Sequence, residues 1–258
     1  MVEQGGHNPG IGEAHGSWLH GLVEAINRAV GFKIVDDFVV VSWLVMLILV
    51  ILAIAATRRR SWVPRGVQNL MEFVVESLNN FLALVIGPEG PQYTPLVGTL
   101  FIYIFCLNVM GLIPGFVAPT STLNMTVSLA VIAIIMVQYY GIKRNGLWGY
   151  IRHFIGEPWG LFFLNIPLHL ISEFFAKPLS LAVRLFGNIF GEDTVMVQIA
   201  LLGVAAYAAT KIPLPVHLPI MAFGLFTSFV QALVFSMLTG VYIALITAHH
   251  EEGHEHAH

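Results

Sequence analysis

The sequence predicts an all-α polytopic membrane protein with about five membrane-crossing helices, two of them long, strongly tilted and paired as a hairpin. Of its 258 residues, 57% are hydrophobic and only 10% are charged, and the mean hydropathy is +0.78. Soluble domains carry about 25% charged residues. Several apolar stretches also reach the roughly 20 residues that a bilayer-crossing helix requires. Residues 37–248 are therefore expected to form one integral membrane domain.

The first 36 residues form a polar segment rich in Gly, His, Glu and Asn. They lack the basic start and the cleavage site of a signal peptide. Apolar residues recur within this segment at three- and four-residue intervals: Leu19, Leu22, Val23, Ile26 and Val30. This pattern predicts one short amphipathic helix over residues 15–30. The first membrane span is predicted at residues 38–56, where Ser42 is the only polar side chain.

The pattern changes over residues 64–86, where polar and apolar side chains occupy opposite faces of the predicted helix. The polar face consists of Gln68, Asn69, Glu72, Glu76, Asn79 and Asn80. Such a helix lies along a membrane surface or against a partner helix. Two further spans are predicted at residues 96–113 and 125–140.

A long hydrophobic stretch with unusually many polar side chains covers residues 159–210. As one helix, residues 168–210 would be roughly 60 Å long, about twice the hydrocarbon thickness of a bilayer. The helix must therefore tilt strongly or break. The last span, at residues 215–247, is also too long to stand upright. Residues 249–258 form a His/Glu-rich tail that we expect to be solvated rather than to hold a metal ion.

Basic residues outside the spans predict the orientation of the chain. Most of them would lie on one side of the membrane: Arg58, Arg59, Arg60, Arg65, Lys143, Arg144 and Arg152. The other side would hold Arg28, Lys33 and Lys211. Cytoplasmic loops carry the excess of Lys and Arg. With five crossings, the N-terminus is expected outside and the C-terminus in the cytoplasm.

Arg184 is a guanidinium within the otherwise largely apolar run of residues 178–193. An arginine near the bilayer centre costs roughly 2.5 to 3.5 kcal/mol on insertion scales. It cannot lose its charge by deprotonation, so another group must offset this cost. A buried cation of this kind indicates an ion pathway. The alternative is a structural arginine that pairs with Glu173 or with a backbone carbonyl.

A polar stripe is predicted around this arginine. On a continuous helix, six polar residues fall within about 40° of one direction: Glu173, Lys177, Ser180, Arg184, Asn188 and Gln198. Glu192 lies about 80° from that direction. Gly187 and Gly191 share the side of Arg184 and would let another helix approach the backbone closely. A row of protonatable and hydrogen-bonding groups beside a fixed positive charge suits proton or cation transfer.

Other classes of function fit the sequence less well. The net charge of −3 gives no basic surface for nucleic acid, and Cys106 is the only cysteine. No set of residues has the spacing of a metal site, a phosphate-binding loop or a clustered nucleophile, so no cofactor or metal is expected. A secondary ion-coupled transporter is the alternative function, but it should show paired internal repeats, and the arginine segment has no second copy.

The segment Lys177–Asn188 resembles the signature of ATP synthase subunit a, the stationary proton-channel subunit of F-type ATP synthases. Residues 229–235 are similar to the family's last span, with the family's glutamine at Gln231. The similarity covers about residues 37–248. It implies a subunit that is not an enzyme on its own and provides two offset half-channels to a rotating c-ring, with Arg184 between them. The implied partners are the c-ring, the peripheral-stalk subunit b and membrane lipid, and the implied cargo is H⁺, with Na⁺ left open.

The resemblance also implies roles for single residues. The outer half-channel would contain Asn188, Glu192, Asp193 and Gln231, and the inner one Glu173 and Ser180. The family's outer acid normally falls nine residues after the arginine, at Asp193, whereas helical geometry favours Glu192; both are kept. Some members carry a histidine seven residues before the glutamine, where this chain has Gly224, and Glu192 is the candidate substitute. The expected location is a bacterial inner membrane, with a thylakoid as the alternative.

Overall fold

The computed structural model describes residues 36–58, 66–113, 116, 118–155, 162–210 and 217–248, together with Gly21, Val23 and Arg28. The amphipathic helix predicted at residues 15–30 and the tail at residues 249–258 lie mainly outside these residues. The described chain is almost entirely helical and contains no strand. This confirms the predicted all-α class.

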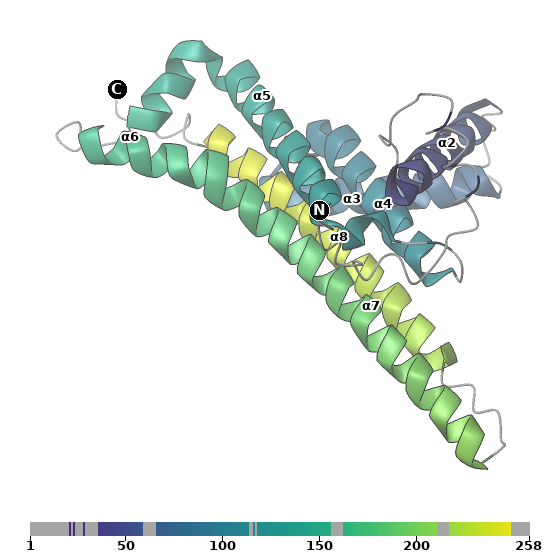
Figure 1. Ribbon diagram of the computed structural model, residues 1–258. Helices are drawn as coiled ribbons and strands as arrows, with labels where there is room; N and C mark the ends of the chain where they lie inside the picture. The colour runs from purple at the N-terminus through teal and green to yellow at the C-terminus, as the bar shows by residue number, and fades with distance from the viewer. Residues whose placement is uncertain are drawn as a thin grey trace, which may run out of the picture.

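The order of elements follows the predicted spans (Figure 1). The helices are α2 (Asp37–Arg58), α3 (Val67–Ile86), η2 (Gly90–Tyr93), α4 (Thr94–Leu112), η3 (Pro119–Ser121), α5 (Leu123–Ile155), α6 (Phe162–Ile171), η5 (Ser172–Ala176), α7 (Lys177–Thr210) and α8 (His217–Ala248). Six described helical stretches are long and apolar enough to cross a membrane. One of the six is Gln68–Ile86 in α3, the helix that its two-faced pattern predicts to lie along the surface.

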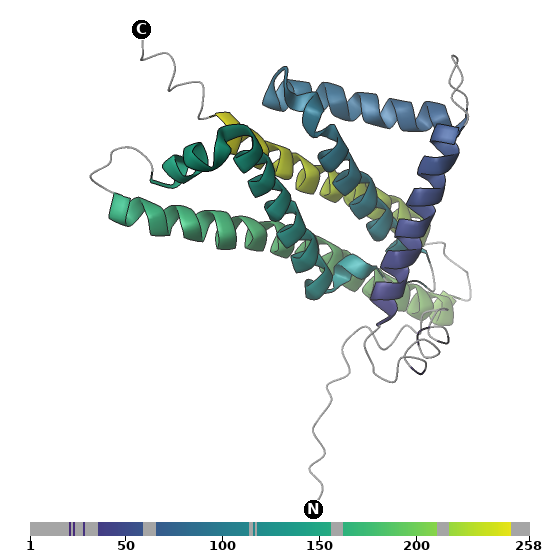
Figure 2. The same ribbon diagram turned by 90° about the horizontal axis from the view of Figure 1, so that it is seen from above.

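Helix α3 runs across the direction of α2 instead of continuing it, as the view from above shows (Figure 2). It keeps a two-faced character, because Leu78 and Leu82 are buried while Glu72 and Glu76 are exposed. At its end the chain turns tightly at Gly90. A Cβ atom at Gly90 would overlap the backbone of Leu82, so the turn requires a glycine.

The described part of the long stretch, residues 162–210, forms one uninterrupted helical run. Helices α6 and α7 are joined by the five-residue π-helix η5 and together form one slanting rod beside α8 (Figure 1). Of the two outcomes predicted for this stretch, a strong tilt or a break, the described residues show no break. A π-helical turn holds more residues than an α-helical turn, so it rotates the side chains that precede it relative to those that follow it.

Helix α5 extends beyond the predicted span at residues 125–140. It continues to Ile155, with Gly146 in a non-helical conformation (φ 68°, ψ 167°) that marks a kink. Hydropathy predicted only the apolar part of this helix, because the segment after Tyr140 carries Lys143, Arg144 and Arg152.

The core lies where α4, α5, α7 and α8 meet. Its fully buried side chains include Ile104 and Leu107 from α4, Leu181 and Leu185 from α7, and Phe235 from α8. Helix α7 thus turns one face to the core. Its opposite face carries exposed residues over most of the helix length.

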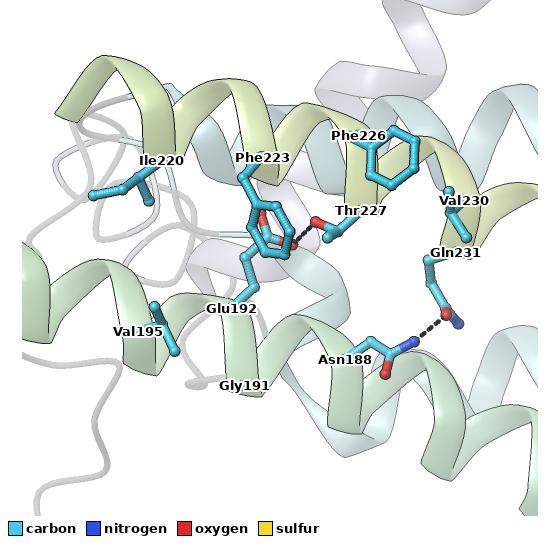
Figure 3. A pocket seen from close by; sticks show the side chains of 10 residues that line it. All are labelled: Asn188, Gly191, Glu192, Val195, Ile220, Phe223, Phe226, Thr227, Val230 and Gln231. Atoms are coloured by element: carbon cyan, nitrogen blue, oxygen red, sulfur yellow. Dashed lines mark hydrogen bonds between the residues drawn. The ribbon is translucent and has the colours of Figure 1, made fainter. Parts of the chain in front are cut away.

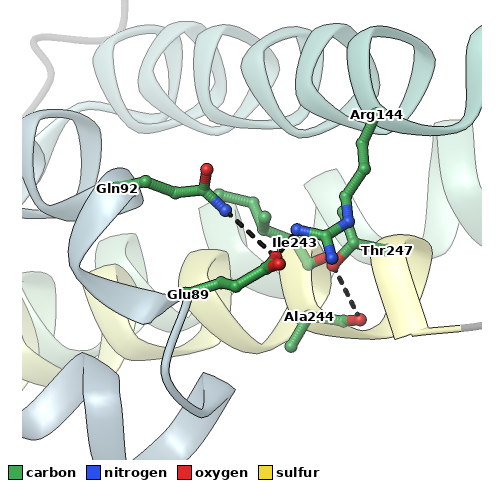
Figure 4. A network of polar contacts seen from close by, with 6 residues as sticks. All are labelled: Glu89, Gln92, Arg144, Ile243, Ala244 and Thr247. Carbon is green, nitrogen blue, oxygen red and sulfur yellow. Dashed lines mark hydrogen bonds and ion pairs between the residues drawn. The ribbon is translucent and has the colours of Figure 1, made fainter. Parts of the chain in front are cut away.

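A polar network lies beside the end of α8 near Thr247 (Figure 4). Arg144 of α5 forms an ion pair with Glu89, which also accepts a hydrogen bond from Gln92 at 3.4 Å. Next to it, the Asn145 side-chain amide donates to the carbonyl oxygen of Ile246 at 2.7 Å. The last carbonyls of a helix lack partners within the helix, so Asn145 serves as a cap from another element.

Candidate functional site

Arg184 lies on the face of α7 that points away from the core. Ser180, Arg184, Asn188 and Gln198 are all exposed in the described chain. No hydrogen bond or ion pair joins Arg184 to another described residue, and Glu173 is bonded elsewhere. The guanidinium is therefore available to a partner outside the described chain.

Two glycines leave the surface beside Arg184 open. Cβ atoms placed on Gly187 and Gly191 would meet no described atom within 4 Å. Both glycines are exposed. The small-residue pair therefore packs against nothing in the described part of this chain, and the space over it can admit a helix from another molecule.

Glu173 does not belong to this exposed face. Its side chain is buried, with 5% of the residue exposed, inside the π-helical turn η5. It forms an ion pair with Lys177 and accepts a hydrogen bond from Gln138 at 3.2 Å. The prediction of one continuous polar stripe is wrong at Glu173, because the π turn rotates this residue away from the line of Arg184.

The Glu173 carboxylate belongs to a network that reaches three helices. Gln138 of α5 accepts a hydrogen bond from the Tyr150 hydroxyl at 2.7 Å. The ammonium group of Lys177 lies 4.9 Å from the ring centre of Tyr242 in α8. Burial, and secondarily the nearby Glu173 charge, raises the pKa of Tyr150 to about 12. Tyr150 is therefore a neutral hydrogen-bond donor at physiological pH.

A cavity of about 330 Å³ lies between α7 and α8 (Figure 3). Its polar lining consists of Asn188, Glu192, Thr227 and Gln231. The Asn188 amide donates to Gln231 Oε1 at 2.5 Å, and the Thr227 hydroxyl donates to Glu192 Oε2 at 2.6 Å. Gln231 Nε2 is buried and has no hydrogen-bond partner among the described residues. A donor in this position calls for a water molecule or another acceptor.

Glu192 and Asp193 occupy different positions. Glu192 projects toward α8, where Gly224 leaves the room that its carboxylate occupies. A Cβ atom at Gly224 would overlap Glu192 Oε1 and would lie 2.6 Å from Leu112 Cδ2. Asp193 is half-buried and is not part of the cavity lining. Geometry thus places Glu192, and not Asp193, in the cavity with Asn188 and Gln231.

Comparison with known proteins agrees with the two motifs. Residues 39–244 match the family model of the ATP synthase A chain. The chain belongs to this family. It is 40% identical over 222 residues to ATP synthase subunit a of Protochlamydia amoebophila, covering 83% of this chain and 81% of the relative. It is 43% identical over 206 residues to ATP synthase subunit a of Moorella thermoacetica, covering 80% of this chain and 88% of the relative. It is 40% identical over 226 residues to ATP synthase subunit a of Geobacter sp. strain M21, covering 86% of this chain and 89% of the relative.

Several contacts in this chain could not be anticipated from the motifs. Thr227, Gln138 and Tyr150 were not singled out, although each touches a carboxylate or its direct partner. Gln138 offered a signal, because it is a polar residue inside an apolar span. Thr227 offered none, since threonines in membrane helices commonly bond to their own backbone.

Proposed function

We propose that the chain is the stationary proton-translocating subunit of an F-type ATP synthase and offers two offset half-channels to a rotating c-ring. The observation that supports this function best is Arg184, a permanent cation that is exposed beside two open glycines and has no hydrogen-bond or ion-pair partner among the described residues. A charge held in this way needs an anion from a neighbouring molecule. A carboxylate on each subunit of the ring is such an anion.

Arg184 separates the half-channels by electrostatics. Its charge favours the ionised form of a ring carboxylate, so each ring site must release its proton before it passes the arginine. A proton then cannot cross directly from one half-channel to the other. Transport requires rotation, driven by about 2.3 kcal/mol per charge for each 100 mV of membrane potential.

The outer half-channel consists in this proposal of Asn188, Glu192 and Gln231 around the cavity between α7 and α8. Asp193 is the alternative acid. A carboxylate is suited to the task because it both accepts and releases a proton, and the amides supply hydrogen bonds for water on the way to the ring.

Ser180 and Glu173 are assigned to the inner half-channel. Ser180 is exposed one turn before Arg184, and Glu173 lies farther along the same rod, in the buried network with Lys177. A proton that leaves a ring site after rotation would pass the hydroxyl of Ser180 first. The Glu173 carboxylate would then pass it toward the cytoplasm.

The family and the distribution of charges support the proposed assembly. Membership of the family supports a place in the membrane sector of an ATP synthase. In this proposal the partners there are the c-ring, the stalk subunit b and membrane lipid. The bacterial relatives support a bacterial inner membrane. The distribution of basic residues supports an outer N-terminus and a cytoplasmic C-terminus. The coupling ion in this proposal is H⁺, with Na⁺ as the alternative, because the ring carboxylate site, which belongs to another chain, selects the ion.

The test is Arg184→Ala in the complete ATP synthase in inverted membrane vesicles. ATP-driven acidification should be abolished while the subunit still copurifies with the ring. Arg58→Ala, the same exchange at the exposed end of α2, is the matched control and should pump normally. Normal pumping by Arg184→Ala would overturn the proposal. Solute transport by the purified chain alone in liposomes would instead support a secondary transporter.

The two candidate acids are separated by Glu192→Gln and Asp193→Asn. The cavity geometry predicts that loss of Glu192 reduces pumping more than loss of Asp193 does. A larger loss of pumping in Asp193→Asn would instead assign the outer proton route to the side of α7 that faces the core.

A further inference from the structure

The Thr227 hydroxyl lies between two acceptors. It is 2.6 Å from Glu192 Oε2 and 3.0 Å from the carbonyl oxygen of Gly224, one turn earlier on α8. A hydroxyl group has one proton to donate and can accept hydrogen bonds through its lone pairs. It can therefore donate to only one of the two oxygens at full strength, and rotation about the C–O bond selects which one.

We propose that Thr227 is a positioning residue that holds Glu192 in the cavity in both of its protonation states. The inference rests on the proposed function, in which Glu192 takes up and releases a proton. When Glu192 is ionised, Thr227 donates its proton to the carboxylate. When Glu192 is protonated, its acid proton is donated to Thr227 Oγ1, and the hydroxyl proton turns to the Gly224 carbonyl. No bond to hydrogen breaks within Thr227, and the transported proton stays on Glu192.

The residues around Glu192 show why the Thr227 hydroxyl matters for the position of the carboxylate. Thr227 is the hydrogen-bond donor that the described residues supply to Glu192. The other polar lining residues, Asn188 and Gln231, bond to each other, and apolar Phe223 and Leu112 lie near the carboxylate. Without a donor that serves the anion, the carboxylate would turn toward water or toward Arg184, away from the position that Gly224 leaves open.

The charged neighbours of Glu192 come from its own helix. Asp193 follows it directly, and Arg184 lies two turns earlier on α7. Helices α8 and α4 face it with Gly224, Thr227 and Leu112, none of which titrates. A change in the pH dependence of proton flux after a substitution at Thr227 thus reports on Glu192 and its direct charged neighbours.

The experiment measures ATP-driven proton pumping by the complete enzyme in inverted vesicles over a range of pH. Thr227→Val, which keeps the shape but removes the hydroxyl, should lower pumping about tenfold and displace the pH profile by about one unit. Thr227→Ser should restore both the rate and the profile. Thr239→Val is the matched control. Thr239 is a buried threonine of the same helix, and among the described residues it donates only to the Phe235 carbonyl, at 3.0 Å.

A double variant shows whether Thr227 acts through Glu192. Glu192→Gln with Thr227→Val should pump no less than Glu192→Gln alone, whereas a further drop would indicate an independent structural role and overturn the proposal. Wild-type rate and pH profile in Thr227→Val, with Glu192→Gln defective, would overturn the positioning role and leave the proposed function standing. Normal pumping by Glu192→Gln would overturn both the positioning role of Thr227 and the assignment of Glu192 as the outer acid. Normal pumping by Arg184→Ala would overturn the proposed function itself.

Discussion

The buried pair of Glu173 and Lys177 allows a prediction that separates stability from proton transport. The side chains are 6% and 16% exposed, so Glu173→Gln leaves an ammonium group without its anion in a buried site. Breaking a buried pair in this way costs about 3 to 5 kcal/mol. The Tyr242 ring, 4.9 Å from the ammonium, compensates in part. We therefore expect the low end, about 3 kcal/mol, or roughly a hundredfold in the ratio of folded to unfolded chain.

Removing both charges should restore most of the lost stability. The double variant Glu173→Gln, Lys177→Met has no orphan ammonium, so its stability is expected within about 1 kcal/mol of the unchanged protein. The assay is the fraction of the chain that remains with the detergent-purified complex after heating. The same exchange at the exposed pair, Glu89→Gln with Arg144→Met, is the control and should change stability by at most about 1 kcal/mol.

Proton pumping by the double variant then decides what Glu173 does. If Glu173 belongs to the inner half-channel, the stable double variant still pumps poorly, because the carboxylate that would pass the proton is missing. Recovery of pumping together with stability would refute the inner-channel assignment and leave Glu173 with a structural role only. Equal stability of the single and double variants would refute the argument from the unpaired ammonium.

Three further predictions concern other parts of the fold. Gly187→Leu should leave the level of the chain in membranes unchanged, because no described atom lies near the Cβ position of Gly187. It should lower pumping strongly if a ring helix packs there. Pumping at the wild-type rate would contradict ring contact at this glycine. Gly90→Ala should sharply reduce the amount of folded chain in membranes, because the new Cβ would overlap backbone atoms of Leu82 that have no room to move. A normal level of the chain on immunoblots would refute this prediction. Tyr150→Phe should destabilise the complex by about 1 kcal/mol through loss of the hydrogen bond to Gln138. The pH profile of pumping should not change below about pH 10, because the raised pKa of Tyr150 keeps the phenol neutral there. A changed profile on the alkaline side below that pH would refute this prediction.

The helices of the membrane domain were predictable because a bilayer imposes one strong rule, a long run of apolar residues for each crossing. The same rule could not predict where α5 ends. Its last part, up to Ile155, is polar and is shaped by a kink at Gly146, which hydropathy does not report. Helix α3 shows a related limit. Its two-faced pattern indicates a surface helix, yet its length and hydropathy also satisfy the criterion for a span.

The exposed residues of the candidate site followed from helical periodicity, since Ser180, Arg184 and Asn188 all lie on one continuous α-helix. Periodicity failed at Glu173 because it assumes 100° per residue, and the π-helical turn η5 violates that assumption. Contacts between side chains of α7 and α8 could not be predicted from the sequence either. The pairing of Glu192 with Thr227 depends on the register of two helices, which a single sequence does not specify.

That register gives a physical reason for the pair of residues at positions 192 and 224. The two positions face each other across α7 and α8, and the space available there is limited by Leu112. A glutamate on α7 therefore requires a residue without a side chain on α8, and a bulky titratable side chain on α8 would require a small residue on α7. One side chain of this size fits at this point of the cavity, and either helix could supply it. In this chain α7 supplies the carboxylate, Gly224 makes the room, and Thr227 is placed to hold the carboxylate there.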